Sequence, residues 1–192
     1  MSNTKAIAIV GVGGQGTVLT SDILIEGLVD LGYDVKKTEQ HGLSQRGGTV
    51  NCMVKYGDAV YAPLIAEGEA DVVLAFEKIE AIRWLKLLKK GGTVIANSFE
   101  ILPIPVKMGK AVYPHDAIEQ ISQQVEDVCE LNATAEAEKL GTVRVASIIL
   151  LGALVKKLGL ESYDWQSLIR KNVPTKFLEA NLKAYEVGRQ SM

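Results

Sequence analysis

Two glycine-rich segments in the first fifty residues carry most of the chemistry that this sequence suggests. The first contains Gly11, Gly13, Gly14, Gln15 and Gly16 and directly follows an apolar run at residues 6–10. The second runs from His41 and Gly42 through Ser44, Gln45, Arg46 and Gly47 to Gly48. Because glycine has no side chain, it lets a ligand approach the backbone closely. We therefore predict a site built from backbone amides, with a phosphate or another anion as its natural ligand.

Two side chains of the second segment could act on such an anion. The guanidinium of Arg46 can hold a phosphate or a carboxylate through two parallel hydrogen bonds. The alternative is that Arg46 binds loop carbonyls or pairs with Glu39. As an imidazole, the side chain of His41 is a candidate for transferring protons near neutral pH. Because the sequence places no second histidine or carboxylate beside it, a structural or interface role for His41 is the competing interpretation.

Polar residues also follow two apolar strand-like segments further along the chain. Glu77 comes directly after residues 71–76, and Asn97 ends residues 93–97. Open α/β sheets bind ligands at the carboxyl ends of their strands, so both residues are candidates for ligand contacts. The alternatives are that Glu77 begins a helix and that Asn97 forms a turn or cap.

Several kinds of catalytic site have no sequence support. The two cysteines, Cys52 and Cys129, form no C-x-x-C pair and cannot alone hold an iron–sulfur cluster or a structural zinc ion. We expect both to be small core residues. The sequence has no G-x-x-x-x-G-K-S/T phosphate loop, G-x-S-x-G turn or H-E-x-x-H helix. We predict no catalytic residue and no metal ligand in this chain.

The first glycine segment also matches the dinucleotide-binding pattern G-x-G-x-x-G. Glu39 stands where that pattern places an acidic residue at the end of the second strand. A dinucleotide fold would continue into a helix, whereas this chain continues into the second glycine segment and then an expected hairpin. Three interpretations stay open here: binding of NAD(P), tight strand-to-helix packing without a ligand, and binding of an anion or a cofactor phosphate.

Alternating strand-like and helix-like segments predict how these residues are positioned. We expect an α/β fold, a three-layer Rossmann-like arrangement with a mostly parallel sheet and an antiparallel hairpin insertion. The hairpin would pair residues 49–56 with a return strand at 59–62. The other expected strands are 6–10, 33–39, 71–76, 93–97 and 125–131, and the expected helices are 15–31, 79–88, 115–124, 133–140, 143–158 and 175–189.

Composition and charge restrict the class of protein. The 192 residues suit one domain, taken here as residues 1–192, and 47% of them are apolar. A formal net charge of −2 argues against non-specific nucleic-acid binding. There is no signal peptide at the start of the chain and no apolar run long enough to cross a bilayer, so we expect a cytoplasmic protein without membrane contact.

Together these segments resemble the gamma domain of 2-oxoacid:ferredoxin oxidoreductases, and within that family the small (beta) subunit of the indolepyruvate type. The resemblance covers nearly the whole chain, and Ser44-Gln45-Arg46-Gly47-Gly48 is its most specific part. Glu77 and Asn97 fit it as well. Three places depart from the pattern: Leu43 replaces a methionine, Ser147 replaces an asparagine, and Asn51-Cys52 is closer to the pyruvate type.

The resemblance implies a share in a reaction that this chain does not perform alone. The family decarboxylates a 2-oxoacid oxidatively on thiamine diphosphate, passes electrons through iron–sulfur clusters to ferredoxin and transfers the acyl group to coenzyme A. Thiamine diphosphate and the 4Fe–4S clusters would belong to a large (alpha) subunit, so this chain would be a non-catalytic subunit and meet ferredoxin only indirectly. The two glycine segments and Arg46 would receive the coenzyme A pyrophosphate or shape the active-site entrance.

Three functional alternatives therefore remain at this point. The first is the oxidoreductase subunit just described, for which a homodimer of the isolated chain is an open variant. The second is an independent NAD(P)-dependent oxidoreductase, and the third is a nucleotide-sensing module without chemistry. Binding of NAD(H) by the purified chain would favour the second, and co-purification with a large cluster-bearing subunit would favour the first.

Overall fold

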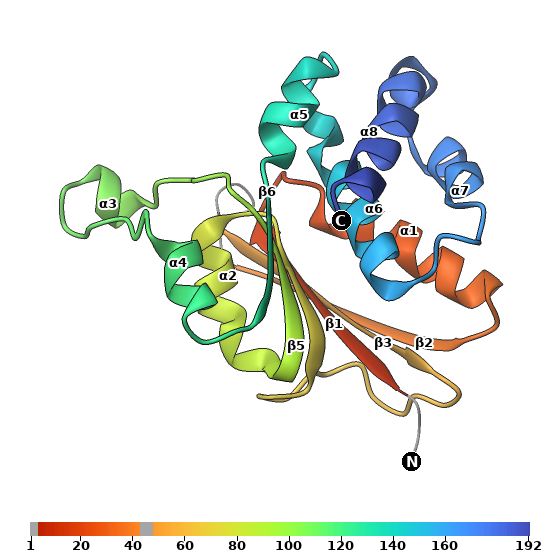
Figure 1. The fold of residues 1–192 in the computed structure, drawn as a ribbon, viewed down its shortest axis with the longest axis horizontal. Helices are drawn as coiled ribbons and strands as arrows, with labels where there is room; N and C mark the ends of the chain where they lie inside the picture. Colours follow the sequence, from red (N-terminus) through yellow and green to blue (C-terminus); the bar gives the residue numbers. More distant parts are fainter. Residues whose placement is uncertain (1–3, 43–47) are drawn as a thin grey trace.

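A single mixed sheet with helices on both faces forms the body of the molecule (Figure 1). The computed structural model describes residues 4–42 and 48–192. In sheet order the strands are β2 (Asp34–His41), β3 (Thr49–Gly57), β1 (Lys5–Val12), β4 (Ala70–Ala75), β5 (Leu88–Asn97) and β6 (Asp127–Leu131). The helices are α1 (Thr17–Asp30), α2 (Lys78–Trp84), α3 (Ile104–Lys107), α4 (Ala117–Ser122), α5 (Ala133–Lys139), α6 (Ala146–Leu158), α7 (Trp165–Asn172) and α8 (Leu178–Gln190), with 3₁₀ turns at Leu85–Leu87, Val143–Val145 and Thr175–Phe177.

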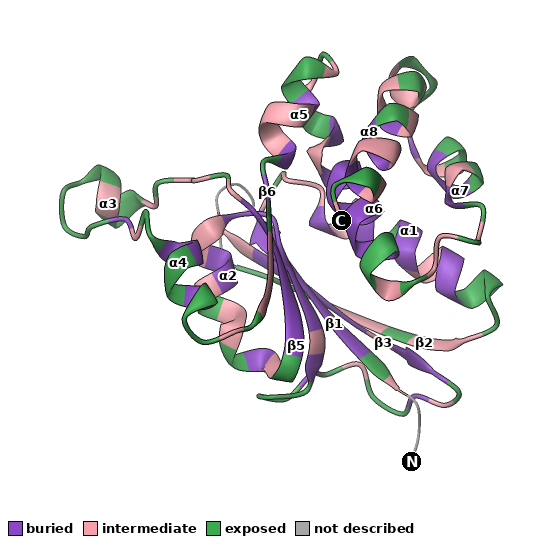
Figure 2. Ribbon diagram, in the orientation of Figure 1, coloured by how far each residue is buried: buried purple, intermediate pink, exposed green. Residues whose placement is uncertain are grey.

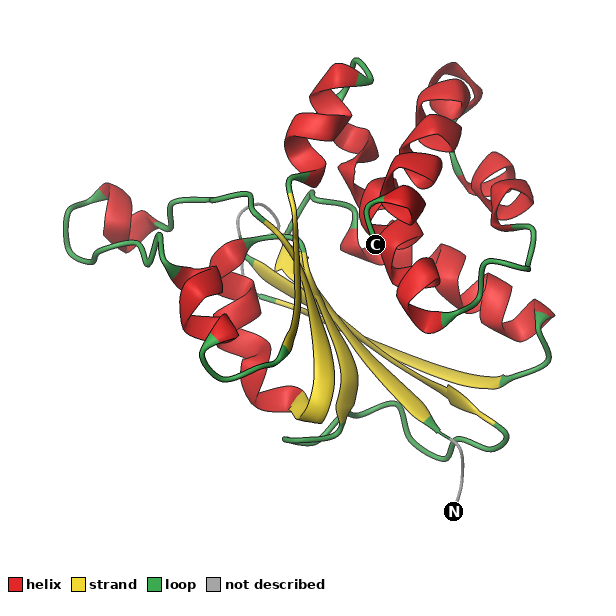
Figure 3. Cartoon of the chain, in the orientation of Figure 1, coloured by secondary structure: helices red, strands yellow, loops and turns green. Residues whose placement is uncertain are grey.

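The direction of the strands confirms the predicted fold class. β1, β4, β5 and β6 are parallel neighbours, whereas β3 is antiparallel to both β1 and β2. The sheet is therefore mostly parallel with one reversed strand, as the yellow strands in Figure 3 show. Helices α2 and α4 cover one face, and α1, α6, α7 and α8 cover the other (Figure 1). The result is the expected three-layer arrangement.

The predicted partner of β3 was wrong. The hairpin is formed by β2 and β3, with Asp34 opposite Gly57 and His41 opposite Val50. Residues 58–69 contain no strand, and Tyr61 among them is 95% exposed. The physical reason is that β1 and β2 occupy both edges of β3, which leaves no backbone groups for a return strand.

Two boundaries also differ from the sequence-based expectation. Helix α2 ends at Trp84, and β5 already begins at Leu88, before the glycine pair that was expected to separate them. Leu88 pairs with Ala70, and the next pair in the register joins Thr93 to Val72. The additional residues on β5 form an irregularity in the ladder, with Gly91 at a φ of 74°. A bulge of this kind lets a strand continue through a glycine turn.

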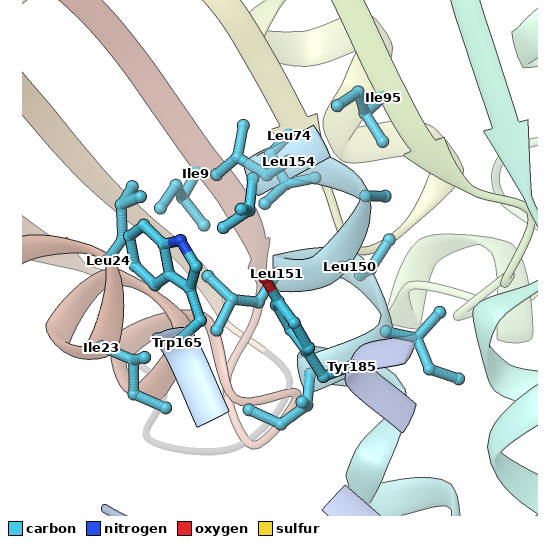
Figure 4. Packing of buried hydrophobic residues seen from close by; sticks show 14 of the residues in the cluster. Ile9, Ile23, Leu24, Leu74, Ile95, Leu150, Leu151, Leu154, Trp165 and Tyr185 are labelled. Carbon is cyan, nitrogen blue, oxygen red and sulfur yellow. The ribbon is translucent and has the colours of Figure 1, made fainter. Parts of the chain in front are cut away.

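Successive side chains of the central strands point to opposite faces of the sheet, and this divides the core into two layers. Ile7 and Ile9 of β1 pack toward α1 and α6, whereas Ala6, Ala8 and Val10 pack toward α2 and α4. Figure 2 shows the central strands almost entirely buried. In Figure 4, Ile9, Leu74 and Ile95 of the sheet face Leu150, Leu151 and Leu154 of α6. Because the side chains alternate with period two, one apolar strand supplies both layers.

Helices α6 and α8 approach each other so closely that their backbones touch. A Cβ atom added at Gly188 would lie 1.8 Å from the carbonyl oxygen of Ile149, and one at Gly152 would lie 2.3 Å from that of Tyr185. Both positions therefore require glycine for packing. This contact holds α6 in place, and α6 carries Ser147 to the glycine turn described below.

No helix among the described residues has the length and apolar character that a bilayer crossing requires.

Candidate functional site

The carboxyl ends of β1 and β4 lie side by side in the centre of the sheet. The helix after β1 covers one face of the sheet, and the helix after β4 covers the opposite face (Figure 1). Such a switch point leaves a crevice between the two strand ends, and open α/β sheets bind ligands there. The first glycine segment begins inside β1 at Gly11 and continues past its end, and Glu77 follows β4, so both flank this crevice.

The side chain of Gln15 connects the two strand ends. Its Oε1 accepts a hydrogen bond of 2.7 Å from the backbone N–H of Val12, and its Nε2 donates to the carbonyl of Phe76 at 3.0 Å. A Cβ atom at Gly11 would lie within 2.9 Å of Gln15, Thr17 and Phe76. Gly11 is therefore needed for packing, and Gln15 orders the turn that begins the site.

The amino end of α1 forms the part of the site best suited to an anion. Gly16 precedes the helix with a φ of 92°, and no side chain of the described residues caps the helix. A Cβ atom at Gly16 would meet Ser147 at 2.8 Å, so α6 packs directly against this turn. A fourteen-residue helix concentrates partial positive charge and unpaired N–H groups at this end. The binding of an anion at this turn stays a prediction.

A cavity of about 570 Å³ opens at the amino end of α1. Residues of both predicted glycine segments line it together with their neighbours in α1 and β3: Gly13, Gly14, Gly16, Thr17, Val18, His41, Gly42 and Val50. The backbone N–H of Gly13 donates to the carbonyl of Gly48 at 2.9 Å, which joins the two segments directly. Ser44, Gln45, Arg46 and Gly47 lie outside the described residues, between Gly42 and Gly48.

A second cavity of about 280 Å³ lies on the other side of Gly14. Its lining includes Gln15, Asn97, Thr134 and the exposed Arg144. The side-chain amide of Asn97 donates to the Phe76 carbonyl at 3.2 Å and to Thr134 Oγ1 at 3.0 Å. Its Oδ1 is buried and accepts no hydrogen bond from the described residues. Asn97 is thus placed at the strand end, with one acceptor not used by the fold.

Glu77 is buried and already has three hydrogen-bond donors. It accepts from the backbone N–H of Glu80 at 3.1 Å, from that of Ile101 at 2.9 Å and from the hydroxyl of Tyr113. The first contact caps α2, as the helix-start interpretation expected. Burial, together with the hydrogen bond to the Glu77 carboxylate, raises the pKa of Tyr113. Both oxygens of Glu77 therefore serve the fold, and a ligand contact stays a prediction.

Glu80 and Arg83 form a polar cluster that the sequence analysis missed. Glu80 is buried on α2 and accepts hydrogen bonds from Thr49 Oγ1 at 3.3 Å, from Trp84 Nε1 at 3.2 Å and from Arg83. Glu77, Glu80 and Arg83 all line a further cavity of about 290 Å³. Burial raises the pKa of Glu80, and the nearby Arg83 offsets this only in part. No short motif marks these residues, because Thr49 approaches them only in the folded sheet.

The raised pKa of Glu80 predicts a pH-dependent contribution to stability. The folded state holds this proton more tightly than the unfolded chain, whose value is near 4.5. The stabilising contribution is therefore present below that value and is lost as the pH rises through the folded-state pKa. We expect Glu80→Gln to remove this loss, measured by urea unfolding from about pH 4 to about pH 8. The exposed Glu119→Gln is the control, and a pH slope equal to that of the wild type would contradict the prediction.

The remaining predicted residues occupy ordinary structural positions. Glu39 pairs with His41 at 3.2 Å and with Lys37, whose hydrogen bond lowers the pKa of Glu39. Cys52 is buried in the core, and Cys129 is partly buried with its sulfur 3.0 Å from that of Met192. In the described part of the chain, no three His, Cys, Asp or Glu side chains are grouped to hold a metal ion.

Comparisons with known proteins agree with this architecture. The family model "Pyruvate ferredoxin/flavodoxin oxidoreductase" matches residues 6–191. Indolepyruvate oxidoreductase subunit IorB of Pyrococcus horikoshii is 41% identical over 191 residues, covering 95% of this chain and 93% of that protein. The protein of the same name from Thermococcus kodakarensis is 39% identical over 189 residues, covering 95% of this chain and 93% of the relative.

Two solved structures show the same fold. The gamma subunit of a keto/oxoacid ferredoxin oxidoreductase from Geobacter sulfurreducens has a TM-score of 0.71 at 24% identity and covers 97% of each chain. The 2-oxoglutarate:ferredoxin oxidoreductase of Magnetococcus marinus, solved with 2-oxoglutarate, coenzyme A and succinyl-CoA, has a TM-score of 0.77 at 17% identity. That match covers 100% of this chain but 31% of the longer one.

Proposed function

This chain belongs to the pyruvate ferredoxin/flavodoxin oxidoreductase family and is a subunit of a 2-oxoacid:ferredoxin oxidoreductase; we propose that it is the small subunit of an indolepyruvate-type enzyme. The observation that carries the proposal is the identity of 39–41% over 95% of the chain with relatives named for indolepyruvate. The complete enzyme would oxidatively decarboxylate the 2-oxoacid to an acyl-CoA and pass the electrons to ferredoxin.

The proposed division of labour places the redox cofactors on a large (alpha) subunit. A 4Fe–4S cluster needs four ligands, usually cysteine thiolates, and this chain contains two cysteines. Cys52 is buried in the core, and burial raises its thiol pKa, which disfavours the thiolate that would bind iron. Thiamine diphosphate and the 4Fe–4S clusters would therefore reside on the partner, and this chain would be non-catalytic. Ferredoxin would meet the complex through that partner.

Coenzyme A is the ligand that best suits the cavity at the amino end of α1. Its pyrophosphate would face the backbone amides of Gly14, Gly16 and Thr17, where the helix dipole favours negative charge. Arg46, in the segment between Gly42 and Gly48, would add a guanidinium. Support comes from the start of α1, which no described side chain caps, from the size of the cavity and from the junction between Gly13 and Gly48. The alternative is that the same residues shape the entrance to the partner's active site.

We expect Arg46→Ala to raise the KM for coenzyme A about tenfold, because a charge-assisted hydrogen bond to phosphate is lost. The KM for the 2-oxoacid should change little. The measurement is acyl-CoA formation by the complex reconstituted with the large subunit. Arg170→Ala, an exposed substitution on α7, is the control. An unchanged KM for coenzyme A would leave Arg46 without this role.

The proposed function is tested by isolating the native complex. The chain should co-purify from native extract with a brown, thiamine-dependent large subunit, and the complex should reduce ferredoxin with indolepyruvate and coenzyme A. Pyruvate and 2-oxoglutarate, assayed in parallel, identify the 2-oxoacid that is preferred. Turnover of NAD(H) by the chain alone, without any partner, would instead support the independent dehydrogenase.

A further inference from the structure

Residues 99–113, here named the arm, project from the body of the molecule between β5 and α4 (Figure 1). The arm contains α3, which buries none of its residues. Its exposed large apolar side chains are Phe99 (37%), Leu102 (41%), Ile104 (72%), Met108 (60%) and Val112 (90%). These are five of the ten exposed large apolar residues in the described part of the chain. Such a concentration in one projecting segment indicates an interaction surface.

The base of the arm is held firmly to the body. Glu77 accepts hydrogen bonds from both ends of the arm, from the N–H of Ile101 and the hydroxyl of Tyr113. Beside this contact, Glu100 pairs with Lys78 at 3.1 Å and with His115 at 2.8 Å. One buried carboxylate thus joins the outgoing and returning chains. The arm therefore leaves the body in a defined direction.

The tip of the arm is ordered by its own backbone. The N–H groups of Lys107, Gly109 and Lys110 donate to the carbonyls of Pro103, Val106 and Pro105 at 3.0, 2.9 and 2.8 Å. Gly109 makes the return turn with a φ of 68°. These bonds hold Ile104 and Met108 in solvent without packing them into the core. A preorganised segment of this kind loses little conformational entropy when it binds.

Beyond Glu100 at its base, the arm carries charge of one sign. Between Glu100 and His115 the only charged residues are Lys107 and Lys110. Neither lysine has an ion pair among the described residues. A surface that receives the arm must therefore combine an apolar groove with acidic side chains at its rim, because opposite charges steer association and exclude wrong partners.

We propose that the arm docks into an apolar groove with an acidic rim on the larger subunit of the same oxidoreductase; this inference rests on the proposed function. Two observations favour that occupant over a second copy of this chain. In the Magnetococcus marinus protein the matched region is 31% of a longer polypeptide, so this fold occurs there joined to further protein. A two-fold dimer formed arm against arm would place Lys107 and Lys110 near their own copies, and like charges would repel.

The test uses the full chain and the purified large subunit. Ile104→Asp combined with Val112→Asp should weaken the complex about 100-fold, because two apolar anchors become charged. Tyr61→Asp introduces the same charge at a residue that is 95% exposed outside the arm, and it should leave the affinity unchanged. The dissociation constant is measured by surface plasmon resonance, and circular dichroism checks that each variant unfolds at the wild-type temperature.

A charge-reversal pair tests the acidic rim separately. Lys107→Glu with Lys110→Glu should lower the association rate about tenfold at low ionic strength and reverse its salt dependence, because the like charges then repel and salt screens that repulsion. Wild-type affinity in the Ile104/Val112 variant would overturn the inference while leaving the proposed function intact. If the Ile104/Val112 variant loses self-association but still binds the large subunit, the partner of the arm is a second copy of this chain and the inference is overturned. If the wild-type chain does not bind the large subunit, the proposed function fails and this inference falls with it.

Discussion

Replacing Glu77 by alanine is expected to lower the free energy of unfolding by about 4 kcal/mol, because three donors would be left without their partner. These are the backbone N–H groups of Glu80 and Ile101 and the hydroxyl of Tyr113. The side chain is only 1% exposed, so water cannot simply replace the carboxylate. The same change removes the carboxylate that joins the two ends of the arm, so binding to the larger subunit should weaken as well.

Urea unfolding of the full chain measures the first effect, and hydrogen exchange at the Ile101 amide reports on the base of the arm. Tyr113→Phe removes one of the three contacts and should cost about 1 to 2 kcal/mol. Glu119→Ala is the control, because Glu119 is an exposed carboxylate on α4. A loss for Glu77→Ala no larger than that of the control would show that Glu77 does not hold the arm.

Gly188→Ala is expected to destabilise the protein by about 3 kcal/mol although alanine favours helices. The added Cβ would lie 1.8 Å from the carbonyl oxygen of Ile149, and 2.7 Å from its carbonyl carbon. These are backbone atoms, so no rotamer change relieves the clash and α8 must move away from α6. The reciprocal contact of Gly152 with Tyr185 would open at the same time.

The measurement for Gly188→Ala is the denaturant midpoint of the full chain, with the slope of the transition checked for a two-state response. Lys183→Ala introduces the same residue on the exposed face of the same helix and should change stability by less than about 0.5 kcal/mol. A stabilised Gly188→Ala variant would mean that helix propensity outweighs the backbone contact.

Most elements of this fold follow from local patterns in the chain. The apolar run at 6–10 lies within β1, and the helix expected at 15–31 is α1, which spans Thr17–Asp30. Gly159 ends α6 in the left-handed conformation, as its position after a long apolar helix indicates. Helix α7 was not predicted. It is short, and its start depends on a single capping residue, Asp164.

Of the candidate site, the structure shows one expected feature, which is that the two glycine segments lie together. The N–H of Gly13 donates a hydrogen bond to the carbonyl of Gly48. The binding roles of Gly11, Gly16, Glu77, Asn97 and the other candidates stay predictions. The connecting role of Gln15 was not foreseen, because the carbonyl of Phe76 that it reaches is sixty-one positions away. The Glu80 cluster was missed because Thr49 comes from another strand.

The sequence by itself determined the α/β class, the glycine turn before α1 and a cysteine content too small for a cluster. These properties depend on residue type and on spacings of a few positions, which backbone geometry converts directly into strands, turns and helices. Only the tertiary structure decided that β2 completes the hairpin with β3 and that Glu77 joins both ends of the arm. Strand partners and the donors to a buried carboxylate come from distant segments, and they are selected by the packing of the whole core.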